Sequence, residues 1–171
     1  IPPSGGISAL KISGINGLLL QKSRDFFSFL KISLPSALER TLKDEYEIGI
    51  ISQNNENSYF IVITVNDFGK AFSSMLDWER SMKKDLAFLN PVADIVISVN
   101  TATSTATSTM EVTTPAKTGV FSWKDIIIRN KDTRAFANDR NRTEIVYTFL
   151  DKNTILITNN LSAIGDLSYA Y

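Results

Sequence analysis

The chain has 171 residues, of which 43% are hydrophobic and 21% are charged, a composition typical of globular proteins. Lys and Arg together number 18, as do Asp and Glu, so no excess charge favours nucleic acid as a partner. The absence of cysteine and histidine excludes disulfides, the usual zinc sites and catalysis by thiol or imidazole. We therefore expect no cofactor, no metal and no nucleic-acid partner, and we favour a non-catalytic protein over an enzyme.

Residues 1–22 are interpreted as a linker followed by a first strand. The opening IPPSGG is rich in proline and glycine, and residues 7–15 alternate loosely in polarity. The chain does not begin with methionine. We expect the natural protein to continue upstream and to carry a signal or membrane anchor there.

Residues 23–99 are expected to form a first α+β lobe. The predicted elements are helices at 23–30 and around 35–42, a hairpin of strands at 46–52 and 59–65, a helix at 67–90 and a strand at 92–99. Asn66 or Asp67 is the predicted N-cap of the long helix, and Pro91 follows its end.

The long helix carries the strongest pattern and the only oddly placed acid. Its apolar stripe consists of Phe68, Phe72, Met75, Met82, Leu86 and Leu89. Glu79 falls near the middle of this stripe. A buried charge persists only when it is paired, so we predict a structural ion pair and name Arg134 as the partner. The alternative is a carboxyl group with a raised pKa that acts as acid or base in an apolar cleft.

Residues 100–118, NTATSTATSTMEVTTPAKT, separate this lobe from the rest of the chain. The segment is mostly Ser, Thr and Ala, carries only Glu111 and Lys117 as charges, and has no aromatic residue. Such a composition buries too little apolar surface to offset the entropy of ordering. We interpret it as an exposed spacer, or as an extended arm because threonine alternates along part of it.

Residues 119–171 are expected to form a second lobe that shares the core of the first. The predicted elements are a strand at 121–129, a hairpin of strands at 144–150 and 154–158, and a helix at 161–168. Residues 61–66 (IVITVN) and 155–160 (ILITNN) each end a hairpin and lead into a helix. We therefore predict an α+β fold of antiparallel hairpins with helices packed on one face, and with a hairpin-helix unit used twice.

Five aromatic residues are candidates for a binding surface, although aromatics at such spacings usually belong to the core: Trp78, Trp123, Phe26, Phe27 and Phe29.

Three segments carry a resemblance to known sequences. They are residues 72–82 (FSSMLDWERSM), residues 123–125 (WKD) followed by 128–134 (IRNKDTR), and residues 147–158 (YTFLDKNTILIT). Together they resemble uncharacterised membrane-anchored proteins of candidate-phylum bacteria of the Parcubacteria type. The resemblance implies a cytoplasmic N-terminal part, one transmembrane helix and an extracytoplasmic domain that corresponds to this chain. It implies no activity, cofactor or catalytic residue.

The first functional hypothesis is therefore an extracytoplasmic, membrane-tethered interaction or structural module whose partner is an envelope protein or a glycan. The first alternative is a carboxylate-dependent, glycan-active hydrolase with Glu79 as its acid. An ion-paired Glu79, or the lack of a second carboxylate within about 10 Å across a cleft, would argue against it. The second alternative, a ligand-binding sensor domain, requires a closed apolar pocket of at least ~300 Å³.

Overall fold

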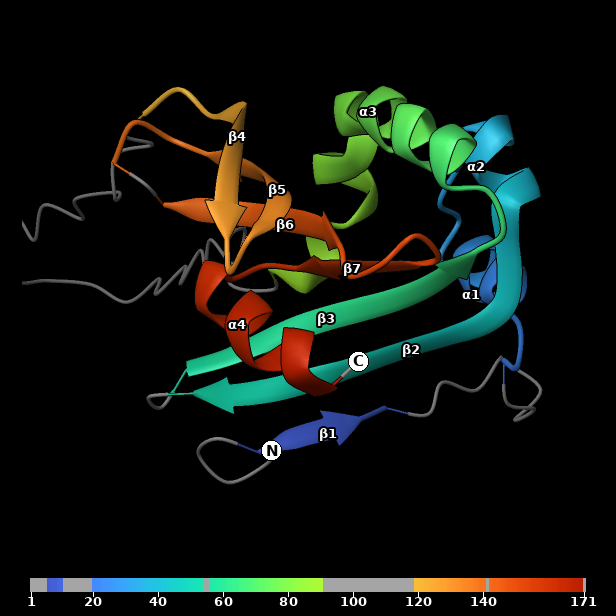
Figure 1. The fold of residues 1–171 in the computed structure, drawn as a ribbon, viewed down its shortest axis with the longest axis horizontal. Helices are drawn as coiled ribbons and strands as arrows, with labels where there is room; N and C mark the ends of the chain where they lie inside the picture. Colours follow the sequence, from blue (N-terminus) through green and yellow to red (C-terminus); the bar gives the residue numbers. More distant parts are fainter. Residues whose placement is uncertain (1–5, 11–19, 54–55, 91–118, 141, 171) are drawn as a thin grey trace, which may run out of the picture.

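The computed structural model describes residues 6–10, 20–53, 56–90, 119–140 and 142–170. Within these ranges the strands form a seven-stranded antiparallel sheet of order β1-β2-β3-β7-β6-β5-β4 (Figure 1). The strands are β1 (Ile7–Ala9), β2 (Leu42–Gln53), β3 (Glu56–Val65), β4 (Ser122–Ile128), β5 (Lys131–Ala137), β6 (Thr143–Phe149) and β7 (Thr154–Thr158). The helices are α1 (Ser23–Phe29), α2 (Ser36–Thr41), α3 (Phe68–Asp85), the 3-10 turn η1 (Ala87–Leu89) and α4 (Leu161–Ala170).

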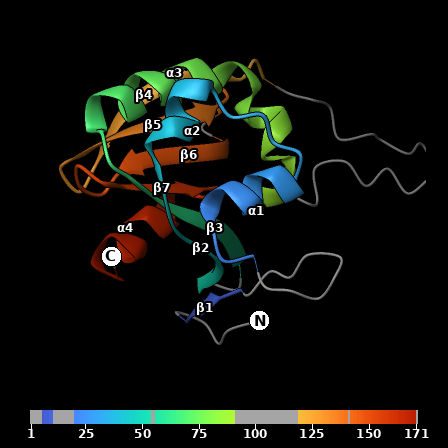
Figure 2. The ribbon, with the colours of Figure 1, turned by 90° about the vertical axis from the view of Figure 1, so that its right-hand side faces the viewer.

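The predicted α+β class is confirmed, but the helices do not all pack on one face. Helices α1, α2 and α3 cover one face, whereas α4 covers the other (Figure 2). The side chains of β3 point alternately to the two faces of the sheet, so this strand contributes to the hydrophobic core on each side. Ile61 and Ile63 face α3, while Phe60 and Val62 face the α4 side. None of the described helices is long and apolar enough to span a membrane.

The hairpin-helix unit occurs twice, as β2-β3-α3 and as β6-β7-α4. The pairing of β3 with β7 is symmetric about Val62 and Leu156, because Ile61 pairs with Ile157 and Ile63 with Ile155. A two-fold axis through this pair, perpendicular to the sheet, exchanges the two hairpins but preserves the two faces of the sheet. If this axis also related the helices, α3 and α4 would lie on the same face of the sheet. The symmetry therefore relates the hairpins and does not extend to α3 and α4.

Strand β5 was not predicted from the sequence. It follows β4 through a two-residue turn in which Arg129 and Asn130 have φ angles of 49° and 62°. Two consecutive positive φ angles define the type I′ turn that favours tight hairpins. Arg134 consequently lies in the sheet, on β5, and not in a connection between strands.

Helix α3 begins where it was predicted, with the Asp67 carboxylate accepting a hydrogen bond of 3.0 Å from the main-chain N–H of Lys70. Its buried face differs from the predicted stripe. The buried residues are Ala71, Ser74, Met75, Trp78 and Met82. Phe68 and Phe72 are instead 43% and 41% exposed. The helix is thus rotated so that two predicted core aromatics reach the surface.

The remaining aromatic predictions divide in the same way. Trp78, Phe26 and Phe27 are buried as expected, Trp123 is partly buried, and Phe29 is 41% exposed. The predicted spacer or arm at residues 100–118 and the predicted strand at 92–99 lie outside the described residues.

Candidate functional site

A polar row crosses three neighbouring strands on the face covered by α3. Asp125 on β4 is paired in register with Arg134 on β5, which is in turn paired with Tyr147 on β6. Residues in register on adjacent strands project to the same face of a sheet. The three side chains therefore form a line that runs from the edge of the sheet towards its centre.

Glu79 reaches this row from α3, and the structure brings it together with Arg134. The guanidinium group donates from Nε to Oε1 and from Nη2 to Oε2 of Glu79, each at 2.7 Å. The Tyr147 hydroxyl donates to Oε1 at 2.8 Å, and Arg134 Nη1 donates to Asp125 Oδ1 at 2.7 Å. A two-point contact between guanidinium and carboxylate fixes both groups in one orientation.

The network is buried at its inner end and open at its outer end. The side chains of Glu79 and Arg134 are 10% and 20% exposed, whereas that of Asp125 is 85% exposed. The Trp123 indole N–H donates to the main-chain oxygen of Glu79 at 3.1 Å, which fixes α3 to β4 at this point. Glu79 is therefore held through both its side chain and its backbone.

Burial and the Glu79 carboxylate both raise the pKa of the Tyr147 hydroxyl, with burial the larger cause. Hydrogen bonding to Glu79 is the main cause that raises the pKa of Arg134. Tyr147 thus acts as a neutral hydrogen-bond donor and Arg134 as a permanent cation. All three donors converge on Glu79, so its carboxylate is oriented towards Arg134 and Tyr147 and not towards a substrate. The arrangement is that of a structural ion pair.

The raised pKa of Tyr147 predicts a loss of stability in alkali. The unfolded chain releases this proton above pH ~10, whereas the folded protein retains it, so stability is full below pH ~10 and falls as the pH rises further. We expect wild type to lose about 1.4 kcal/mol more than Tyr147→Phe between pH 9 and pH 11, measured by urea unfolding. Parallel pH profiles of the two proteins would contradict the assignment.

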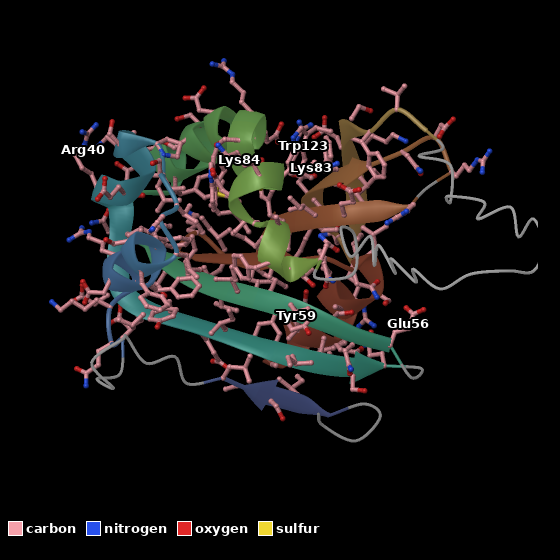
Figure 3. The ribbon with its side chains drawn as sticks, turned by 180° about the vertical axis from the view of Figure 1, so that it is seen from behind. Arg40, Glu56, Tyr59, Lys83, Lys84 and Trp123 are labelled. Atoms are coloured by element: carbon pink, nitrogen blue, oxygen red, sulfur yellow. The ribbon has the colours of Figure 1, made fainter. Side chains whose placement is uncertain are left out.

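A second set of contacts holds the C-terminal part of α3 against the sheet. Lys83 Nζ lies 2.8 Å from Glu144 Oε2 and 5.0 and 5.5 Å from the ring centres of Phe121 and Phe136. Figure 3 labels Lys83 on α3 and Trp123 on β4, and the Trp123 ring lies 5.4 Å from that of Phe136. The end of α3 is therefore attached to β5, to β6 and to the residue that precedes β4 by charge and aromatic contacts together.

A polar cleft of about 590 Å³ lies elsewhere, beside the first turn of α4. It is lined by Glu56, Asn57, Ser58, Arg142, Thr143, Asn159, Asn160 and Leu161. Glu79 does not line it, so it is not the cleft that the hydrolase hypothesis requires. The cleft is open and largely polar, which also differs from the closed apolar pocket expected of a sensor domain.

The chain matches no protein-family model, no curated protein and no solved structure.

A set of five apolar side chains lies around α3 and β4, of which four are exposed and Phe149 is partly buried. Phe68, Phe72 and Leu76 recur every four residues along α3 and are 43%, 41% and 38% exposed. The rings of Phe68 and Phe72 lie 5.0 and 5.9 Å from that of Phe149 on β6. Ile127 on β4 is 75% exposed. We call these five residues the α3–β4 surface.

Proposed function

We propose that this chain is a non-catalytic interaction module that binds a polypeptide partner through the α3–β4 surface. The observation that carries the proposal is the exposed row of Phe68, Phe72 and Leu76 on α3. Exposed apolar groups that lie together cost free energy in water unless they have a use, and they commonly mark sites of protein association. Aromatic residues in particular contribute strongly to binding energy at such sites.

The geometry of Glu79 supports a non-catalytic role over the hydrolase alternative. Its two carboxylate oxygens accept three hydrogen bonds from Arg134 and Tyr147. An acid in glycoside hydrolysis must present its proton to the leaving oxygen of the substrate. Glu79 would first have to release Arg134, at the cost of leaving a largely buried guanidinium group with Asp125 as its remaining ion-pair partner.

We further propose that the module works on the extracytoplasmic face of a membrane, tethered to it, with an envelope protein as partner. The resemblance of residues 72–82, 123–125, 128–134 and 147–158 to membrane-anchored proteins supports this location, as does the Ser/Thr/Ala-rich composition of residues 100–118. The aliphatic side chains of Leu76 and Ile127 in the α3–β4 surface favour a protein over a glycan, because aliphatic groups pack against apolar protein side chains but cannot stack on the C–H face of a sugar ring as aromatic rings do.

Selection of phage-displayed random peptides on the purified chain tests the interaction. We expect enriched peptides to lose binding by at least about 10-fold on Phe72→Glu, since a buried charge replaces an aromatic contact. Tyr169→Glu is the matched control, because Tyr169 is 80% exposed on α4, on the other face of the sheet. Thermal unfolding of both variants checks that each remains folded.

Equal binding by wild type and Phe72→Glu, or enrichment of no peptide, would overturn the proposal. So would specific retention of the chain on a purified cell-wall glycan through the polar cleft beside α4, since the partner class would then be different.

A further inference from the structure

Strand β4 is an unpaired edge of the sheet. Its seven residues pair with β5 on one side, and no described residue pairs with its other side. The opposite edge of the sheet is β1, which has only three residues. A long open edge is the feature through which sheets accept a further strand.

The geometry of the β4–β5 hairpin determines which backbone groups face outwards. In a hairpin with a two-residue turn, the residues that flank the turn form a hydrogen-bonded pair, here Ile128 and Lys131. Hydrogen-bonded and non-hydrogen-bonded pairs then alternate along the ladder. It follows that Trp123, Asp125 and Ile127 direct their N–H and C=O groups away from β5, towards the open edge.

The usual protections of an edge strand are weak here. Strand β4 contains no proline, and its pairing with β5 is regular over all seven residues, without a bulge. Its one lysine, Lys124, is occupied, because Nζ donates to the main-chain oxygen of Asn138 at 2.8 Å. Asp125 is the only other charged residue of the strand.

The charges at this edge indicate what an added strand should carry. Asp125 is 85% exposed, and Asp132 on β5, which is in register with Ile127, is exposed as well. The nearby cation, Arg134, already binds Glu79 through two nitrogens and Asp125 through the third. On the α3 face of this edge the carboxylates of Asp125 and Asp132 therefore outnumber the one guanidinium group. The other cations of the hairpin are engaged elsewhere: Lys124 and Lys131 donate to the main-chain oxygens of Asn138 and Leu150, and Arg129 lies over the ring of Tyr169. Ile127, 75% exposed and two residues along the strand, presents an apolar neighbour on the same face.

We propose that β4 accepts an extended segment of a partner polypeptide as an eighth, antiparallel strand of this sheet. The segment carries a lysine or arginine opposite Asp125 and an apolar residue opposite Ile127, two positions towards its N-terminus. Opposite charges on directly facing residues stabilise a strand pair, and like charges oppose it. This inference rests on the proposed function, since it specifies how the α3–β4 surface takes up its partner.

The probe is a capped seven-residue peptide with lysine at its centre, isoleucine two positions before it, valine two positions after it and threonine elsewhere. Amide hydrogen exchange, followed by NMR on the full chain, reports where it binds. At about 90% occupancy we expect the amides of Trp123, Asp125 and Ile127 to exchange about 10-fold more slowly. Those of Lys124 and Ile126 are already bonded to β5 and should not change.

Backbone methylation of the peptide separates strand addition from other binding. N-methylation of the central lysine removes an N–H that faces β4, and should abolish binding. N-methylation of the threonine beside it changes an N–H that faces away, and should leave binding within about 2-fold. Asp125→Lys should weaken the lysine peptide about 2- to 5-fold and strengthen a glutamate peptide by a similar factor.

Three results would overturn the inference: equal binding of both methylated peptides, protection of the β4 amides by higher protein concentration alone, or no binding at millimolar peptide. The second result would identify another copy of the chain as the partner. If phage-selected peptides bind in a Phe72-dependent way while the β4 amides stay unprotected, strand addition alone fails. If no peptide depends on Phe72 either, the proposed function fails as well.

Discussion

Glu79→Ala is expected to lower the free energy of unfolding by about 3 kcal/mol, the lower end of the range for breaking a buried ion pair. The substitution leaves the Arg134 guanidinium, 20% exposed, without its two-point partner. It also leaves the hydroxyl of Tyr147, a residue that is 1% exposed, without its acceptor. The loss of stability arises mainly because these buried donors are left without an acceptor, and less from the lost attraction between Glu79 and Arg134. Urea unfolding followed by circular dichroism measures it.

Two variants serve as controls for this prediction. Asp125→Ala removes a contact of Arg134 with an 85% exposed partner and should cost less than about 1 kcal/mol. Glu79→Leu combined with Arg134→Met removes both charges and should recover most of the stability lost in Glu79→Ala. A loss below 1 kcal/mol in Glu79→Ala would mean that water replaces the carboxylate, and that the ion pair is not a structural requirement.

Trp78→Ala is expected to cost about 3 to 5 kcal/mol, the usual range for removing a large buried aromatic side chain. Trp78 is 1% exposed and meets the ring of Phe27 edge-on at 6.0 Å. Its indole N–H donates to Asp85 Oδ2 at 2.8 Å. The substitution therefore opens a cavity between α1 and α3 and removes a hydrogen bond near the end of α3. The shift of the urea midpoint at constant slope gives the value.

Phe72→Ala on the same helix is the matched control, because Phe72 is 41% exposed and leaves no enclosed cavity. It should cost about 1 kcal/mol or less. The loss of stability in Trp78→Phe should lie between those of the two alanine variants. The phenylalanine ring keeps part of the packing, and Asp85 still accepts a hydrogen bond of 2.7 Å from the hydroxyl of Ser81. If Trp78→Ala and Phe72→Ala were equally destabilising, the placement of the buried face of α3 would be wrong.

The hairpins and the long helix were predictable from local patterns. Short runs of apolar, mostly β-branched residues mark β3 and β7. The tight turn at Asp151 follows from a carboxylate that accepts from the N–H groups of Asn153 and Thr154. Strand β5 was missed because its sequence, KDTRAFA, is charged and poor in β-branched residues. Its buried positions are filled by small side chains, Thr133, Ala135 and Ala137, which give a weak hydrophobic signal.

The polar network was predictable only in part. An acid on an apolar helix face requires a partner, and this reasoning named Arg134 for Glu79. The roles of Tyr147 and Asp125 depend on β4, β5 and β6 being neighbours in one register. This register aligns residues of three different strands, one of which was not predicted, so no local sequence pattern indicates it. The one available signal was the Arg129–Asn130 turn, since asparagine is common at positive φ.

The face chosen by α4 was not predictable for a related reason. Leu161, Ala163, Ile164 and Leu167 give the helix an apolar side, but each face of the central strands β3 and β7 is apolar as well. The helix therefore matches either face by composition. Its position is decided by space, because α1, α2 and α3 already cover one face and leave the other free.

The position of β7 between β3 and β6 has a consequence for folding during synthesis on the ribosome. Strand β3 ends at Val65, but the strand that pairs with its inner edge begins only at Thr154. Throughout the synthesis of the intervening chain, the nascent protein presents the unpaired edge of an apolar strand. The sheet is completed only when β7 is inserted at its centre. The slowest folding step is therefore expected to wait until β7 has been synthesised, and a chaperone that covers the edge of β3 would protect the nascent chain until then.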